Sequence, residues 1–215
     1  RDAVGAARSY NNMGYIYRRR GDNRRALEVY GNVEGLLDAE SGPELCDARI
    51  RLASAFLEMG EMDRAGDHAM KAFEESEEQT DIVHARARAV LGRYYARAKE
   101  NELAMQYYSE ALEILSDQAD PGSAVEVAML LGQVLSDAGR REEAAEHYMD
   151  ALLLAEANDF RMLQGELLAR LGEVESDRSQ KVEYLQRSLT VFRELGAVDR
   201  MREVQTSVHR AVMGN

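Results

Sequence analysis

The sequence repeats itself every 39 or 40 residues, and this period constrains the fold more than any other feature. A small residue that follows a large apolar one marks each period, and successive marks lie 39, 39, 40 and 40 residues apart. The small residues are Gly14, Ala53, Gly92, Gly132 and Gly172. Such a period is typical of stacked supersecondary units, because one unit cannot bury its apolar face alone. We therefore expect an array of repeats.

Each period has the pattern of two helices. In the first period, Tyr10, Met13 and Tyr17 follow the three-and-four spacing of a helix stripe, and Gly21 then interrupts it. The chain contains only two prolines, both between periodic segments, which favours an all-helical chain. The pattern predicts helices over residues 2–20, 23–38, 44–59, 62–77, 81–98, 101–116, 121–138, 141–156, 160–176, 179–195 and 197–213.

The recurring glycines predict a close contact between the paired helices. Glycine inside a helix costs about 0.5–1 kcal/mol relative to alanine. Four glycines at the same position of the repeat therefore indicate a packing gain that outweighs this cost. The last helix, 197–213, is apolar along one stripe only, as expected for a helix that caps the array.

Composition and charge limit the possible partners. The net charge is −12, and residues 101–215 carry 11 basic against 21 acidic side chains. This disfavours nucleic acid and anionic membranes, since phosphate contacts need clustered Lys and Arg. The sequence has no long apolar run that would span a membrane and no signal-peptide pattern. With one cysteine, Cys46, no intramolecular disulfide can form, so we expect a reducing, cytoplasmic location.

The residues of the repeat resemble a known family. The block Tyr10-Asn-Asn-Met-Gly-Tyr-Ile-Tyr17, followed by Ala26 and Tyr30, resembles a tetratricopeptide repeat. The same pattern recurs in phase as Leu91-Gly92 with Tyr95, Ala104 and Tyr108, and as Leu131-Gly132 with Ala144 and Tyr148. The resemblance covers nearly the whole chain, although the units are longer than the common length of about 34 residues.

The resemblance implies an all-α fold, a right-handed α-solenoid of about five helix pairs plus a C-terminal capping helix. We expect one solenoid domain over residues 1–215, with units at about 7–40, 46–79, 85–118, 125–158 and 165–195 and the cap at 197–213. Because the chain begins at Arg1 and helical periodicity starts almost at once, we also expect a fragment of a longer protein.

Members of this family usually bind peptides or helices on the concave surface, which the first helix of each pair lines. Carried onto this sequence, the resemblance predicts a peptide-binding groove that includes Arg8, Asn11, Tyr15, Arg18, Ile50, Ser54, Arg86, Arg93, Met129, Gln133, Glu166 and Glu173. With Glu126, which the predicted surface also includes, the charges are mainly basic in the first and third units and acidic in the last two. We therefore expect a ligand that is acidic at one end and basic at the other. The alternative is that these are simply solvated helix faces.

The sequence offers little catalytic chemistry. His68 and His147 occupy the same position two repeats apart, with no ligand spacing around them, so no metal site is predicted. No glycine-rich phosphate loop and no nucleophile motif occur, so no cofactor and no enzyme activity are predicted. We expect a non-catalytic scaffold that binds a protein or peptide partner. The alternative is a ligand-sensing regulatory module of a larger signalling protein. Self-association through the exposed N-terminal end of the array is a further expectation.

Overall fold

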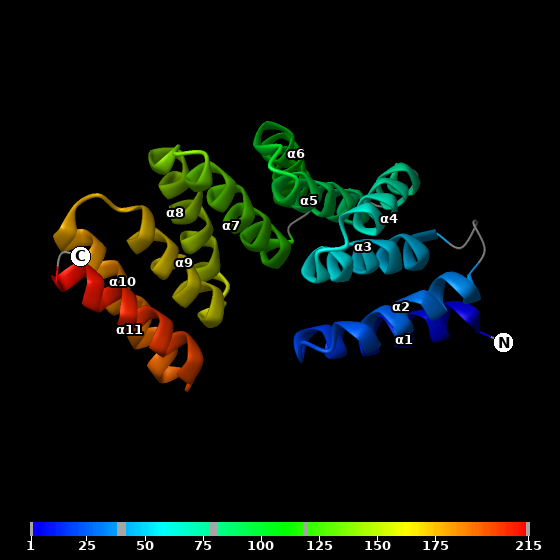
Figure 1. Cartoon of the computed structure of the whole chain (residues 1–215), viewed down its shortest axis with the longest axis horizontal. Helices are drawn as coiled ribbons and strands as arrows, with labels where there is room; N and C mark the ends of the chain where they lie inside the picture. The colour runs from blue at the N-terminus through cyan, green and yellow to red at the C-terminus, as the bar shows by residue number, and fades with distance from the viewer. Residues whose placement is uncertain (1, 38–41, 78–80, 118–119, 214–215) are drawn as a thin grey trace. The chain divides into compact units, whose positions relative to one another are not determined.

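The computed structural model describes residues 2–37, 42–77, 81–117 and 120–213. Within these ranges the chain forms eleven α-helices and no strand (Figure 1). The helices are α1 (Ala3–Arg19), α2 (Asn23–Leu36), α3 (Gly42–Met59), α4 (Met62–Ser76), α5 (Asp81–Arg97), α6 (Asn101–Asp117), α7 (Pro121–Asp137), α8 (Arg141–Ala157), α9 (Arg161–Val174), α10 (Arg178–Glu194) and α11 (Val198–Met213). The all-α prediction is confirmed, and every helix matches its predicted range to within two residues.

The chain divides into two compact units, Arg1–Gln118 and Ala119–Asn215. We call them the N-terminal unit, which holds α1 to α6, and the C-terminal unit, which holds α7 to α11. Each unit is described by itself, and the expectation of one continuous solenoid stays a prediction. The predicted ends of the first three repeats, residues 40, 79 and 118, lie outside the described residues.

In the N-terminal unit, consecutive helices form the antiparallel pairs α1/α2, α3/α4 and α5/α6 (Figure 1). The first helices of the pairs also pack on one another, α1 on α3 and α3 on α5. We call the surface that these three helices share the α1–α3–α5 face. The main core of the unit lies between the pairs and includes the fully buried Tyr30, Phe56 and Leu91.

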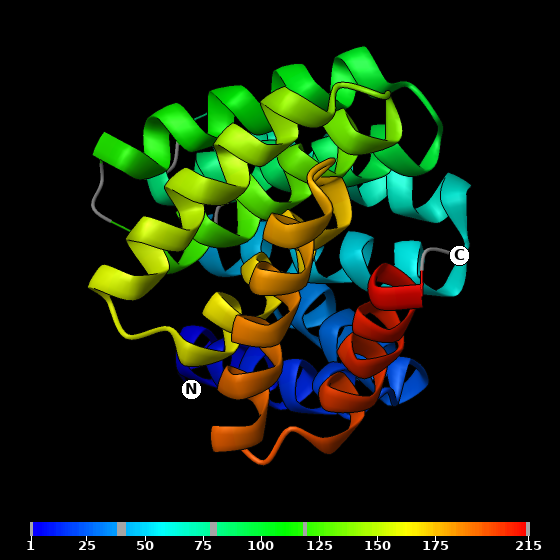
Figure 2. The same ribbon diagram turned by 90° about the vertical axis from the view of Figure 1, so that its left-hand side faces the viewer.

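In the C-terminal unit, α7 pairs with α8 and α9 with α10, and α11 packs on α10 (Figure 2). The buried stripe of α11 centres on Val204, which joins Leu185 and Phe192 of α10 in a small core. The opposite side of α11 is exposed. This one-sided helix has the properties expected of the predicted cap, because it covers an apolar surface and presents a polar one.

Three of the four recurring glycines face an aromatic ring from the second helix of their own pair, and the fourth, Gly172, faces Leu185. A Cβ atom added to Gly14, Gly92 or Gly132 would lie 2.3, 2.7 or 2.4 Å from a ring carbon of Tyr30, Tyr108 or Tyr148, respectively. Real Cβ atoms essentially never come so close to a neighbour. The predicted close contact is confirmed, and at these three glycines its physical basis is a tyrosine ring that lies close against the backbone.

The turns within the pairs also need special backbone conformations. Gly21, Gly60 and Gly139 end the first helices of their pairs with φ between 77° and 82°, a region that glycine adopts without a steric penalty. Lys99 occupies the corresponding turn between α5 and α6 with φ of 67°. This lysine is therefore a strained residue at a position that favours glycine.

Candidate binding site on the first helices

The α1–α3–α5 face carries most of the predicted groove residues of the N-terminal unit. Arg8, Tyr15 and Arg18 project from α1, while Arg86 and Arg93 project from α5. Asn11 and Ser54 also line this face, but only 4% and 7% of their surfaces are exposed. Ile50 is 7% exposed and belongs to the apolar core between α3 and its neighbours. It therefore offers little surface to a ligand.

Ion pairs link the three helices across this face. Arg8 and Arg18 of α1 reach Glu44 and Glu58 of α3, at 2.7 and 2.6 Å. From the other side, Arg86 of α5 reaches Asp47 of α3 at 2.5 Å. These pairs join residues 36 to 40 positions apart, which is about one repeat. The predicted basic residues thus lie around a row of carboxylates that α3 supplies.

Two of these carboxylates are each shared by two arginines. Asp47 contacts Arg86 and also Arg51, whose Nε lies 2.6 Å from it. Glu58 contacts Arg18 at 2.6 Å, and Arg93 lies 3.8 Å away. Arginines outnumber carboxylates in the described part of this face. The arginines are Arg8, Arg18, Arg51, Arg86, Arg93 and Arg97, and the carboxylates are Glu44, Asp47 and Glu58. The face is therefore net positive.

A hollow of about 310 Å³ opens on this face between α1, α3 and α5. Its lining includes Arg8, Asn11, Glu44, Asp47 and Arg86. The side-chain amide nitrogen of Asn11 donates to the Glu44 carbonyl oxygen at 3.2 Å. The Asn11 amide oxygen is buried and accepts no hydrogen bond from the described residues. The hollow thus combines opposite charges with an amide that can still accept a hydrogen bond.

A second polar cluster lies further along the same face. The ring of Tyr15 is 43% exposed and lies near the guanidinium groups of Arg18 and Arg51, at 5.9 and 5.8 Å from the ring centre. Such cation–π contacts hold long side chains in place at the surface. The hydroxyl of Ser54 accepts a hydrogen bond from Arg93 at 3.0 Å.

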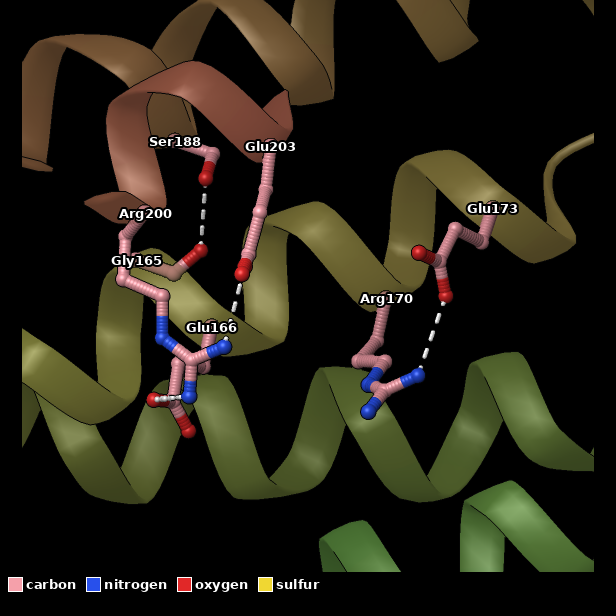
Figure 3. Close-up of polar contacts among 7 residues, drawn as sticks. All are labelled: Gly165, Glu166, Arg170, Glu173, Ser188, Arg200 and Glu203. Carbon is pink, nitrogen blue, oxygen red and sulfur yellow. Dashed lines mark hydrogen bonds and ion pairs between the residues drawn. The ribbon is translucent and has the colours of Figure 1, made fainter. Parts of the chain in front are cut away.

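In the C-terminal unit, Glu166 and Glu173 of α9 line one hollow of about 140 Å³ beside α11. Figure 3 shows the two glutamates with their arginine partners. Arg200 of α11 reaches Glu166 at 3.0 Å, and Arg170 pairs with Glu173 at 3.2 Å. Met129 and Gln133 project from α7 and do not line this hollow. The Gln133 amide instead donates to Asp137 at 2.8 Å. The structure therefore brings together only the two glutamates of this predicted set.

Four residues important to these sites were not predicted as site residues: Arg51, Glu58, Arg97 and Arg200. Arg51 and Glu58 follow Asp47 by four and eleven positions on α3, so helical spacing places all three on one face. That spacing is a signal that the sequence carries. Arg97 donates to the carbonyl of Leu57 at the end of α3, a contact that requires knowledge of how α3 and α5 pack.

Other kinds of site have little support in the described ranges. No group of three or more His, Cys, Asp or Glu side chains lies close enough there to hold a metal ion. Cys46 is buried, and its thiol donates to the Ala72 carbonyl oxygen at 3.3 Å. Among the helices of the described residues, none has the length and apolarity needed to cross a membrane.

The N-terminal helix pair exposes several large apolar side chains. Val4, Met13 and Ile16 of α1 are 38%, 38% and 49% exposed, and Leu36 of α2 is 45% exposed. These side chains lie at the end of the array where self-association is expected. Self-association itself stays a prediction.

Comparisons with known proteins agree with this architecture. Models of the tetratricopeptide repeat family match residues 9–40, 85–116 and 129–188. No curated protein matches the sequence.

Solved structures resemble the chain in fold at low sequence identity. A signal transduction ATPase with numerous domains from Pyrococcus horikoshii, which has a tetratricopeptide repeat sensor, is 19% identical with a TM-score of 0.81. The match covers 95% of this chain and 32% of that protein, so the chain spans about a third of its length. Aspartyl phosphate phosphatase F from Bacillus subtilis is 13% identical over 99% of this chain and 59% of its own, with a TM-score of 0.79. The apo form of RapI is 16% identical over 99% and 85%, with a TM-score of 0.75.

Proposed function

The chain is a tetratricopeptide repeat protein, and from this premise we propose that it is a non-catalytic scaffold that binds an acidic segment of a partner protein on the α1–α3–α5 face. Tetratricopeptide repeats are protein-interaction scaffolds, and the side chains that vary between repeats give each one its specificity.

The observation that carries this proposal is the sharing of carboxylates on the face. Asp47 contacts both Arg51 and Arg86, and Glu58 contacts both Arg18 and Arg93. One carboxylate offsets only one of the two positive charges that it contacts. Arginine presents five donors in a planar fork that suits carboxylates. Acidic side chains of a partner can supply the additional charge. Since the chain as a whole carries a net charge of −12, this positive face is a local feature.

The hollow beside these arginines supports an extended peptide as the ligand. Extended peptides need main-chain hydrogen-bond partners as well as side-chain contacts. The buried Asn11 amide provides an unused acceptor at the wall of this hollow. An acceptor of this kind suits a peptide N–H group.

The proposal is tested with a fluorescein-labelled peptide of alternating Glu and Ser, whose binding is followed by fluorescence anisotropy. The double reversal Arg86→Glu/Arg93→Glu should weaken binding by about tenfold or more, because a charge-assisted hydrogen bond contributes about 1.5–3 kcal/mol. The control double variant Arg24→Glu/Lys71→Glu makes the same change in net charge at exposed positions of second helices. It should bind within about twofold of the unaltered chain.

Two results would overturn the proposal. One is equal binding by the groove variant and by its control, because net charge alone would then account for the affinity. The other is equal binding of a peptide of alternating Lys and Ser. Binding should also weaken as the sodium chloride concentration rises, since the charges of this face are partly exposed.

A second candidate function is ligand sensing within a larger signalling protein. The resemblance to the sensor of the Pyrococcus horikoshii ATPase, which extends over 95% of this chain, favours this candidate. One measurement on the full-length protein distinguishes the two candidate functions. A sensor changes the activity of an attached effector domain when the peptide binds, whereas a simple scaffold does not.

A further inference from the structure

One tyrosine hydroxyl of the N-terminal unit is buried without a hydrogen-bond acceptor. Tyr30 has no exposed surface, and its ring lies against Gly14 of α1. Within the described residues, its hydroxyl donates no hydrogen bond of normal geometry, although its oxygen lies within hydrogen-bonding reach of the guanidinium groups of Arg18 and Arg51. The Nε atom of Arg18 is also buried and donates to no acceptor. Two buried donors without an acceptor are costly, and buried polar groups are nearly always paired.

The surroundings of this hydroxyl are positively charged. The guanidinium groups of both Arg18 and Arg51 lie beside it. Burial raises the pKa of Tyr30, although both arginines oppose that shift. The phenol is therefore neutral at physiological pH and remains a donor. Three donor groups from α1, α2 and α3 thus meet at one place beneath the α1–α3–α5 face.

The half-exposed ring of Tyr15 lies next to both of these arginines. Tyr15 lies over the guanidinium groups of both arginines. With 43% of its surface exposed, Tyr15 is in contact with solvent. On the outer edges, Glu58 holds Arg18 and Asp47 holds Arg51, each at 2.6 Å. These two contacts fix the arginine side chains in position.

We propose that Arg18, Arg51 and Tyr30 form a subsite for one carboxylate side chain of the bound peptide. This inference rests on the proposed function and names the group that the face recognises. A carboxylate has about four lone-pair sites, so it can accept from the phenol and from both guanidinium groups. Glu58 and Asp47 already offset part of the arginine charge.

The test replaces Tyr30 with phenylalanine, which removes the hydroxyl and keeps the ring on Gly14. The matched control is Tyr148→Phe, which makes the same change where a tyrosine packs on Gly132 in the C-terminal unit. Binding of the alternating Glu and Ser peptide should weaken by about tenfold in Tyr30→Phe, since one hydrogen bond to a charged group is lost. It should be unchanged in Tyr148→Phe. The urea midpoint of Tyr30→Phe should change little, because the hydroxyl donates no hydrogen bond of normal geometry in the free protein.

A second probe separates this inference from the proposed function. Sodium acetate, compared with sodium chloride at equal ionic strength, should shift the NMR signals of Tyr15, Arg18 and Arg51 in the unaltered chain but not in Tyr30→Phe. One outcome is that acetate shifts these signals in the unaltered chain and not in Tyr30→Phe while the peptide does not bind. That result would support the subsite and refute the proposed peptide function.

The reverse outcome refutes the subsite alone. If the peptide depends on Arg86 and Arg93 but binds Tyr30→Phe with full affinity, the carboxylate lies elsewhere on the face. A lower urea midpoint for Tyr30→Phe would also contradict the inference, because the hydroxyl would then stabilise the free protein. If neither probe binds, both proposals are wrong.

Discussion

Alanine substitutions at two helical glycines should change stability in opposite directions. In Gly92→Ala, the new Cβ would lie 2.7 and 2.8 Å from two ring carbons of Tyr108. Carbon atoms in contact prefer about 3.5–4.0 Å, so the ring or α5 must move by about 1 Å. Tyr108 is only 1% exposed, and its close surroundings leave little room for that movement. Overpacking of this kind costs about 1–3 kcal/mol.

Helix propensity offsets part of this cost. Alanine is favoured over glycine in a helix by about 0.5–1 kcal/mol, so Gly92→Ala should lose about 1–2 kcal/mol in total. Gly31, in the middle of α2, provides the matched control because an added Cβ would meet nothing within 4 Å. Gly31→Ala should therefore gain about 0.5–1 kcal/mol.

The assay is urea unfolding followed by far-UV circular dichroism. The midpoint should fall for Gly92→Ala and rise for Gly31→Ala, with similar slopes. The double variant Gly92→Ala/Tyr108→Leu should lose less stability than the two single losses predict together, because the smaller side chain relieves the clash. If both alanine variants are stabilised equally, the recurring glycines do not serve to admit tyrosine rings, and the packing argument is refuted.

Three further predictions concern single residues. Burial raises the pKa of the Cys46 thiol to about 11, and the nearby Asp47 carboxylate adds to this shift. Iodoacetamide at about pH 8 should therefore modify the folded chain far more slowly than the urea-unfolded chain. Equal rates of modification would show that the thiol is accessible in the folded chain. Because the unfolded thiol ionises first, stability should also fall as the pH rises from about 9 towards 11, and this decline should be smaller in Cys46→Ala. Lys99→Gly should raise the free energy of unfolding by about 1 kcal/mol in urea titrations, because glycine adopts the φ of 67° without strain. An unchanged urea midpoint would contradict the strain at Lys99. Burial and the charge of Arg88 lower the pKa of His84, so the contribution of His84 to stability should be present above about pH 6.5 and lost as the pH falls below it. The melting temperature of His84→Gln should therefore depend less on pH in this acidic range than that of the unaltered chain. An identical pH dependence would refute this role of His84.

The helices and their pairing could be predicted from the sequence because the same packing pattern recurs in several repeats. Gly92 and Tyr108 recur together in two other periods, so their contact is a property of the pattern. Turn positions such as Gly21 follow from the backbone conformation that a helix end requires. These features depend on local spacing, which the sequence contains directly.

The charged site could be predicted only in part. The family resemblance places Arg8, Arg18 and Arg86 on the binding face, but their partners depend on how far one first helix slides along the next. That register decides that Arg18 meets Glu58, 40 residues further on. The same limitation explains Ile50, which lies at the edge of the helix stripe and is buried by the packing of α3.

The buried Tyr30 hydroxyl without an acceptor could not be predicted at all. Its sequence position marks it as a packing tyrosine, equivalent to Tyr108 and Tyr148. Its polar end becomes distinctive only because Arg18 and Arg51 approach it from two other helices. Side chains that differ between otherwise equivalent positions are therefore the informative ones in such a repeat.

The central claim is that an acidic peptide binds the α1–α3–α5 face, and an NMR footprint tests it most directly. In ¹⁵N-labelled protein, the alternating Glu and Ser peptide should shift the arginine side-chain Nε–H signals of Arg18, Arg51 and Arg86, together with the backbone amides of α1, α3 and α5. Signals from the outer sides of α2, α4 and α6 should stay in place. Shifts confined to those second helices, or spread evenly over the chain, would contradict the account.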